Sequence, residues 1–243
     1  ETKKQITPIL IKYVNNFPDY TDHSIRHSEN VLENATNLLN DKVNKLSSEE
    51  IYTLLLGCYL HDVGMAPTKK DIEKLKLEQN KIGKFKQKDF SEYLREIHQD
   101  LSAKFVLKNW KQLKIDNEDY AQAIAKLCSG HRNSDLLDFK EFPDQLAVGN
   151  NKKINVSFLC GILKLSDELD ITSERIPEIL FNLYYPKNSF SKIEWNKHKN
   201  TRFITFNKPF IEIKGSVSNQ FLFERIKEHH NKIQQTVDEI QKI

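Results

Sequence analysis

The feature that most constrains the fold is the spacing of apolar residues, which recur every three or four positions through most of the first 175 residues. This period places them on one face of an α-helix, so we expect a mainly helical chain. The few helix-breaking residues agree, since 243 residues include only 7 glycines and 7 prolines. Helices are predicted over residues 4–15, 24–40, 48–62, 70–78, 90–109, 117–131 and 153–171.

The pattern changes towards the C-terminal end. Residues 188–215 are rich in Phe, Ile and Thr, and "RFITF" and "FIEIK" alternate with a period of two, which predicts a small antiparallel sheet. Residues 217–243 return to a charged amphipathic helix. We therefore expect a helical domain at 1–180 and, at 181–243, a β element with a terminal helix that packs on the core or extends from it. The second part is a candidate contact for a partner domain or a second copy of the chain.

Composition narrows the functional classes. No apolar run approaches the ~20 residues that a membrane-spanning helix needs, and no signal-peptide pattern is present, so we expect a cytoplasmic protein without membrane contact. The net charge of +3 is too small to indicate nucleic-acid binding and does not exclude it. Residues 69–88 hold eight lysines, which form either a solvated helix face or a cationic rim that attracts an anionic substrate. Cys58, Cys128 and Cys160 lie in apolar segments without CxxC spacing and are expected to be buried free thiols.

A His-Asp pair, His61 and Asp62 in "YLHDVGM", ends the apolar run "IYTLLLGCYL". Two titratable groups at the rim of a core cost free energy unless something satisfies them. An isolated pair is most simply a hydrogen-bonded histidine and a helix-end carboxylate, so the interpretation depends on whether similar residues converge on it.

Four further residues fall on the apolar stripes of other predicted helices. His27, His98, His131 and Asp167 each lie four residues from an apolar member of their stripe, which turns them towards the interior. Each alone is more often structural, and a helical scaffold with satisfied buried histidines remains an alternative. Together with the pair at 61–62 they supply six donors, enough for two metals that share a bridging aspartate.

Imidazole and carboxylate groups suit Fe, Mn, Co, Ni and Zn. The expected cofactor is therefore one or two divalent transition metals, with Mg as a further candidate. His23 lies four residues before His27 in "DHSIRH" and is the alternative first ligand. We favour His27, and expect His23 either to support a metal ligand or to contact the substrate.

The order of His27, the pair at 61–62 and Asp167 in "LSDELD" resembles the HD-domain superfamily of metal-dependent phosphohydrolases. His98 and His131 resemble the additional ligands of its dinuclear subgroup. The resemblance covers roughly residues 20–175. The phrases "YTDHSIRHSENV", "YLHDVGM" and "GILKLSDELD" are most similar to HD domains of bacterial conflict systems, some of which are fused to an Hsp90-like ATPase domain. No Gly-Tyr-Pro motif of the kind found in cyclic-di-GMP phosphodiesterases follows.

The resemblance implies an HD-type helical bundle and a ligand set for each metal. By similarity one metal is held by His27, His61, Asp62 and Asp167. A second is held by His98 and His131, with Asp62 bridging the two.

The resemblance also implies hydrolysis of a nucleotide-type phosphoester or phosphoanhydride, with Asp62 binding both ions. Cations near the ligands are candidates for holding phosphate oxygens. Arg132 and Lys164 are expected to act in catalysis and substrate binding, and Arg95 and Arg175 in substrate binding.

The rival function is a sensor: an HD module of a larger, defence-type assembly that binds a nucleotide and signals with little or no turnover. The strand-rich region and the last helix favour this alternative, because both could attach to a partner or to another domain. A thiol nucleophile at Cys128, three residues before His131, is the weaker interpretation because His131 already has a better role.

Overall fold

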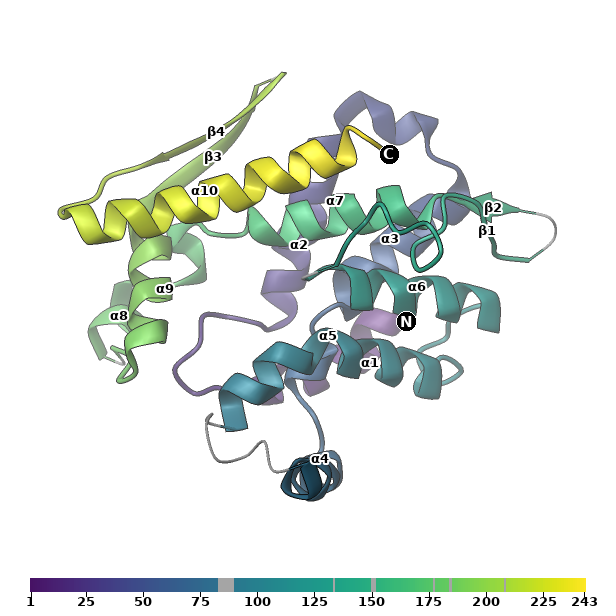
Figure 1. Ribbon diagram of the computed structural model, residues 1–243, viewed down its shortest axis with the longest axis horizontal. Coiled ribbons are helices and arrows are strands. Elements are labelled where there is room, and N and C mark those ends of the chain that lie inside the picture. Colours follow the sequence, from purple (N-terminus) through teal and green to yellow (C-terminus); the bar gives the residue numbers. More distant parts are fainter. Residues whose placement is uncertain (83–89, 133, 150–151, 177, 184, 208) are drawn as a thin grey trace.

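A computed structural model describes residues 1–82, 90–132, 134–149, 152–176, 178–183, 185–207 and 209–243. It shows a mainly helical protein (Figure 1). The α-helices are α1 (Thr2–Leu10), α2 (Ile25–Leu39), α3 (Ser48–Leu60), α4 (Lys69–Ile82), α5 (Phe90–Asn109), α6 (Glu118–Gly130), α7 (Val156–Glu168), α8 (Glu178–Leu183), α9 (Ser189–Asn200) and α10 (Gln220–Ile240). The described 3-10 turns are η1 (Ile11–Asn15), η2 (Asn40–Lys45), η3 (Val63–Met65) and η5 (Ser173–Arg175).

Two antiparallel hairpins complete the described structure. The short one joins β1 (Leu146–Ala147) to β2 (Lys153–Ile154), and the longer one joins β3 (Thr201–Asn207) to β4 (Phe210–Gly215). The predicted strands "RFITF" and "FIEIK" are therefore confirmed, and each helix expected from the apolar spacing is present.

The strand prediction is wrong for residues 188–200, which form α9. Asn188 caps this helix by accepting from the Ser191 backbone N–H at 2.7 Å. Ser191, Trp195 and His198 are its buried residues, and their 4-3 spacing is the pattern of a helix face. The clear alternation begins only at β3, after the helix has ended.

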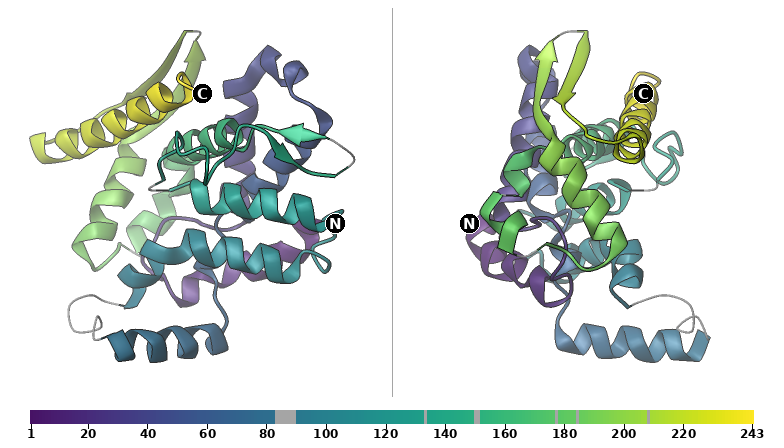
Figure 2. Two further views of the ribbon diagram at one scale, coloured as in Figure 1. Left: turned by 45° about the vertical axis from the view of Figure 1, so that its right-hand side comes forward. Right: turned by 90° about the vertical axis from the view of Figure 1, so that its left-hand side faces the viewer.

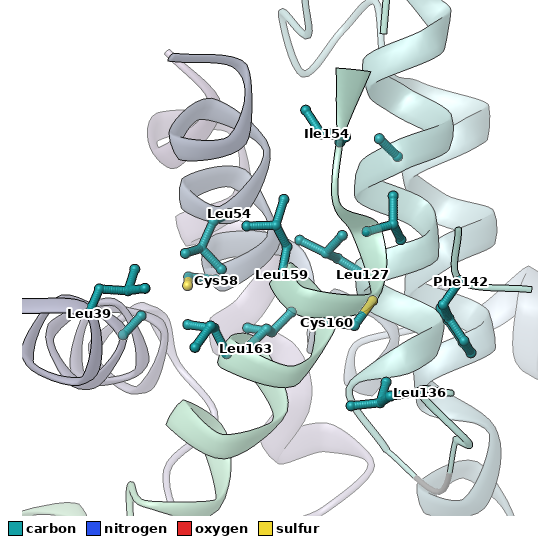
Figure 3. Close-up of a cluster of buried hydrophobic side chains, with 14 of the residues drawn as sticks. Leu39, Leu54, Cys58, Leu127, Leu136, Phe142, Ile154, Leu159, Cys160 and Leu163 are labelled. Carbon is teal, nitrogen blue, oxygen red and sulfur yellow. The ribbon is translucent and has the colours of Figure 1, made fainter. Parts of the chain in front are cut away.

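The main core lies between α2, α3, α6 and α7. Leu54 and Cys58 of α3 pack against Leu127 of α6 and against Leu159 and Leu163 of α7 (Figure 3). All three predicted free thiols are buried. A second cluster joins α1, α3 and α6 to the end of α5. These helices fix the backbone at the places from which the polar residues of the site project.

The C-terminal segment packs on this body. In Figures 1 and 2, α10 runs along α7 and the β3–β4 hairpin lies beside α10, while α4 stands apart from the other helices. Ile233 of α10 is buried against Leu165 and Leu169, and hairpin residues including Ile204 and Ile213 cover the same cluster. The terminal helix thus lies against the core, whereas the domain boundary at residue 180 stays a prediction.

Candidate metal centre

The His-Asp pair occupies the end of α3. A capping box at Ser47 and Glu50 fixes the start of this helix, and buried apolar side chains hold its length. Its last turn therefore delivers His61 and Asp62 to the interior, where they are 0% and 4% exposed. An unpaired charge at such a place would be strongly destabilising, so the carboxylate needs cationic or hydrogen-bonding partners.

The structure brings all six predicted donors together. His27 lies in the first turn of α2, His98 within α5, His131 at the end of α6 and Asp167 in the last turn of α7. The four histidines are buried, and Asp167 is about a quarter exposed, with a side-chain exposure of 27%. Their donor atoms form two groups of three, each with all atoms within 4.8 Å of one another: His27, His61 and Asp167, and Asp62, His98 and His131.

In the first group, His27 Nε2 lies 3.2 Å from His61 Nε2 and 3.2 Å from Asp167 Oδ1. His61 Nε2 is 3.9 Å from the same carboxylate oxygen. Two imidazoles and a carboxylate thus aim one atom each at a common point. Asp167 is the most exposed of the six donors, so this group opens to solvent on its side.

In the second group, His98 Nε2 lies 3.1 Å from His131 Nε2. Asp62 joins this group to the first through its two oxygens. Its Oδ1 is 3.2 Å from His98 Nε2 and 3.7 Å from His131 Nε2. Its Oδ2 is 3.3 Å from His27 Nε2 and 3.5 Å from His61 Nε2. One carboxylate therefore presents one oxygen to each group, which is the geometry of a bridging ligand.

Hydrogen bonds at the other ring nitrogens orient the imidazoles. Nδ1 of His61 donates to the Cys58 carbonyl at 2.9 Å, and Nδ1 of His131 donates to the Cys128 carbonyl at 2.6 Å. Nδ1 of His98 donates to the Arg95 carbonyl at 2.7 Å. A proton on Nδ1 leaves Nε2 with a lone pair, which is the state that binds a metal.

With this tautomer, the 3.1 Å contact between His98 Nε2 and His131 Nε2 indicates a metal site. With both Nδ1 atoms protonated, the facing Nε2 atoms of His98 and His131 both carry lone pairs and cannot hydrogen-bond each other. Burial, followed by the neighbouring His61 and His98, lowers the pKa of His131 to about 3, so this ring is neutral. A cation between the rings would satisfy both lone pairs. The donor set therefore fits divalent transition metals.

The carboxylates of Asp62 and Asp167 supply negative charge to balance that of bound cations. Burial raises the pKa of Asp62, but the neighbouring His61, followed by His27 and His98, outweighs this effect and brings that pKa well below its usual range. Burial likewise opposes ionisation of Asp167, yet its hydrogen bond to His27 holds the pKa low. Both aspartates are thus ionised at neutral pH and available as ligands.

Asp170, which orients His27, was not among the residues predicted from the sequence. The carboxylate is 3% exposed, and its Oδ2 accepts from His27 Nδ1 at 2.6 Å. Asn30 donates to its Oδ1 at 3.1 Å, and Arg175 Nε lies 3.3 Å from Oδ2. The signal in the sequence was its place three residues after Asp167 in "LSDELD", close to one helical turn away.

A cavity of about 170 Å³ adjoins the cluster and contains several of the predicted substrate contacts. His23, Arg95, Arg132 and Arg175 line it together with Asp62, His98, His131 and Asp167. His23 Nδ1 donates to the Thr21 carbonyl at 2.6 Å, and its Nε2 lies 4.0 Å from Asp62 Oδ2. His23 thus borders the cluster, whereas His27 is the member of the first group of donors.

Arg95 and Arg132 supply positive charge beside the second group. Arg132 Nη1 donates to the Arg95 carbonyl at 2.8 Å, and the Arg95 guanidinium lies 4.1 Å from the centre of the Phe190 ring. Burial and the neighbouring Arg132 lower the pKa of Arg95. Within the described residues, neither guanidinium forms a salt bridge with a carboxylate. An anion bound here would relieve their mutual repulsion.

Two predicted phosphate contacts have other partners. Lys164 does not line the cavity, because its ammonium pairs with Glu239 of α10 at 3.0 Å. The expected catalytic and substrate-binding role of Lys164 has no support from this placement and stays a prediction. Arg175 lines the cavity, but its guanidinium donates to the carbonyls of Asp22 and Asp170, so it holds the loop beside His27.

The lysine-rich segment at 69–88 lies partly in α4, and residues 83–88 fall outside the described ranges. None of its described residues lines the cavity. The solvated-face interpretation is thus favoured for the described part of this segment.

Residues from the C-terminal helices, which the sequence analysis placed in a separate unit, form part of the cavity wall. The wall includes Phe190, Ser191, Glu194, Trp195 and His198 of α9, and His229 and Lys232 of α10. Reading α9 as a strand hid this arrangement, because strand alternation does not group positions 191, 195 and 198 on one face.

Comparison with protein families matches residues 17–242 to the HD-CE family, a span that covers the six donors and both C-terminal helices. No curated protein and no solved structure matches the chain. Among the described residues, no helix combines the length and apolar character needed to cross a bilayer. The matched span includes nearly the whole sequence, and the chain belongs to the HD-CE family of HD-type domains.

Proposed function

We propose that the protein is a metal-dependent phosphohydrolase or phosphodiesterase acting on a nucleotide-type phosphoester or phosphoanhydride. The observation that carries the proposal is the Asp62 carboxylate, which faces His27 and His61 with one oxygen and His98 and His131 with the other. Two-metal hydrolases are built around such a shared ligand. Family membership and the adjoining cavity support the same activity.

The donors would hold the ions in two positions. His27, His61 and Asp167 would bind one, His98 and His131 the other, and Asp62 both. Divalent ions at these positions would supply a water molecule of lowered pKa and neutralise charge that builds on the phosphoryl oxygens. The hydrogen bonds at Nδ1 keep each imidazole oriented for this task.

The arginines position the substrate. Arg95 and Arg132 line the cavity and make no salt bridge with a carboxylate in the described structure, so their guanidinium groups are available for non-bridging phosphate oxygens. Such charge-assisted hydrogen bonds fix the phosphoryl group and strengthen as its charge increases in the transition state.

The test is hydrolysis by metal-loaded protein. Wild type and Asp62→Ala are loaded with Mn²⁺, Co²⁺, Ni²⁺ or Mg²⁺ and assayed with aryl phosphates, nucleotides, dinucleoside polyphosphates and cyclic dinucleotides. Asp100→Ala is the matched control, since it removes an exposed aspartate two residues after His98. Turnover in wild type and the control, lost in Asp62→Ala, supports the proposal. A metal-loaded wild type that hydrolyses nothing contradicts it.

A second candidate is a nucleotide-binding sensor in a defence-type assembly, and the contact between α10 and α7 favours it. Glu168, next to Asp167, accepts from Thr236 at 2.9 Å and pairs with Lys232 at 3.1 Å. His229 of α10 lies 2.8 Å from the Glu168 carbonyl. A partner that displaces α10 would therefore act on the segment carrying a predicted ligand. Nucleotide binding without turnover in the same assay supports the sensor.

A further inference from the structure

One face of α9 forms a polar part of the cavity wall. Ser191, Trp195 and His198 are 1%, 6% and 4% exposed, and all three line the cavity. The 4-3 spacing places them on the same side of the helix. Tyr20 and the ring of Phe190, with centroids 6.4 Å apart, continue this wall.

Two polar atoms on this face are buried without a protein partner. Within the described structure, neither the Ser191 hydroxyl nor His198 Nδ1 has a hydrogen-bond partner. Trp195 differs, because its Nε1 donates to the Asp19 carbonyl at 2.9 Å. Buried polar groups are nearly always paired, so two unpaired groups on one helix face beside a cavity indicate a ligand that pairs with them.

The cavity joins this face to a charged region. Arg95 and Arg132 lie beside the metal-binding groups, and the Arg95 guanidinium rests on Phe190, the residue before Ser191. The α9 face contributes a hydroxyl and an imidazole. Burial, followed by the charge of Arg175, brings the pKa of that imidazole well below its usual range, so the face is uncharged. A ligand that fits both regions has an anionic phosphoryl group and an uncharged moiety rich in hydrogen-bonding groups.

We propose that Ser191 and His198 form a substrate subsite that hydrogen-bonds the sugar or base of a nucleoside phosphate while its phosphoryl group lies at the His/Asp cluster. The inference rests on the proposed function and adds the residues that select the substrate. A simple aryl phosphate or an inorganic polyphosphate would leave both groups unpaired. The C-terminal segment therefore determines specificity, and the HD-type helices provide the chemistry.

The experiment compares two substrate types on the full chain. Wild type, Ser191→Ala and His198→Asn are assayed with p-nitrophenyl phosphate, bis(p-nitrophenyl) phosphate and the nucleotide that wild type hydrolyses best. Loss of one neutral hydrogen bond predicts a rise in KM for the nucleotide of about two- to tenfold, with kcat and both aryl substrates little changed. Lys199→Ala is the control, because Lys199 is exposed on the same helix and does not line the cavity.

A change in the KM of Ser191→Ala would not result from loss of folding. The Ser191 hydroxyl has no partner to lose, so the Tm of Ser191→Ala is expected to equal or exceed that of wild type. An unchanged nucleotide KM in both variants overturns the subsite. An equal loss of activity towards aryl and nucleotide substrates also overturns the subsite, since it indicates that the variant has lost catalytic activity as a whole.

The subsite and the proposed function can fail separately. If wild type hydrolyses no substrate, the hydrolase proposal fails and calorimetry with the same nucleotides tests the subsite. Binding to wild type that weakens in Ser191→Ala and persists in Lys199→Ala supports it. No nucleotide binding to wild type, or equal binding to Ser191→Ala, overturns it.

Discussion

Replacing Asp170 with asparagine tests whether the hydrogen bond to His27 controls metal affinity. Asp170→Asn keeps the shape of the side chain and removes its charge, and the 2.6 Å contact with His27 Nδ1 loses its ionic character. A hydrogen bond to a charged group contributes about 1.5–3 kcal/mol, equivalent to roughly 10- to 150-fold in a binding constant. Mutation of such outer partners of metal-binding histidines costs about 10- to 100-fold in affinity. We therefore expect Mn²⁺ or Co²⁺ to bind the first group at least about tenfold more weakly.

The assay is calorimetric metal titration, with two controls. Asn30→Ala removes only the 3.1 Å contact to the other oxygen of Asp170, so a smaller loss is expected. Asp100→Asn removes an exposed carboxylate and should change nothing. If Asp170→Asn binds metal as tightly as wild type with its fold intact, the orienting role of Asp170 is refuted.

The same variant has a pH signature in the metal-free protein. Burial raises the pKa of Asp170. The charge of Arg175 and the hydrogen bond to His27 have the larger, opposite effect and bring the pKa down to about 2. The unfolded value is about 3.9, so the ionised group stabilises the fold above about pH 4 and that contribution is lost as the pH falls towards 2. Urea unfolding should show this slope in wild type. A variant with an identical slope between these pH values contradicts the assignment.

Three further predictions concern packing and roles. A methyl group on Gly64 would lie 2.1 Å from the His98 carbonyl oxygen, so Gly64→Ala should cost about 1–3 kcal/mol in urea unfolding, and unchanged stability would contradict this close approach. Lys164→Met should lower the Tm by leaving Glu239 unpaired while turnover persists; lost turnover at unchanged Tm would restore Lys164 as a phosphate contact. Cys128→Ala should keep turnover, since burial raises the pKa of this thiol well above its usual value, and a folded but inactive variant would revive the thiol nucleophile.

Much of the fold followed from local pattern. Helical spacing located α2, α3, α5, α6 and α7, and the predicted apolar faces turned His27 and His98 inward, where the structure buries them. Asp167 was also expected on an inward face, but its side chain is 27% exposed. These are properties of single helices, which a sequence carries locally. That the six donors bind metal stays a prediction.

The remaining features depend on contacts between distant segments. Asp170 acquires its role from His27, 143 positions away, and Lys164 is buried against Glu239 of a helix 75 positions later. The helical periodicity that placed Asp167 on the inward face of its helix also placed Lys164 there. Periodicity does not predict which residue of another segment an inward side chain will contact. The α9 wall was missed for a similar reason, since its buried face forms only against the body of the protein.

The most direct test of the central claim is metal stoichiometry and position. Manganese content is measured by elemental analysis of loaded wild type, His98→Ala and Asp100→Ala, and the ions in wild type are located by anomalous diffraction. The account predicts about two ions per chain in wild type and the control, with Asp62 between the two sites, and about one in His98→Ala. A wild-type protein that binds no metal under any loading condition would contradict it, and the buried histidines would then be structural.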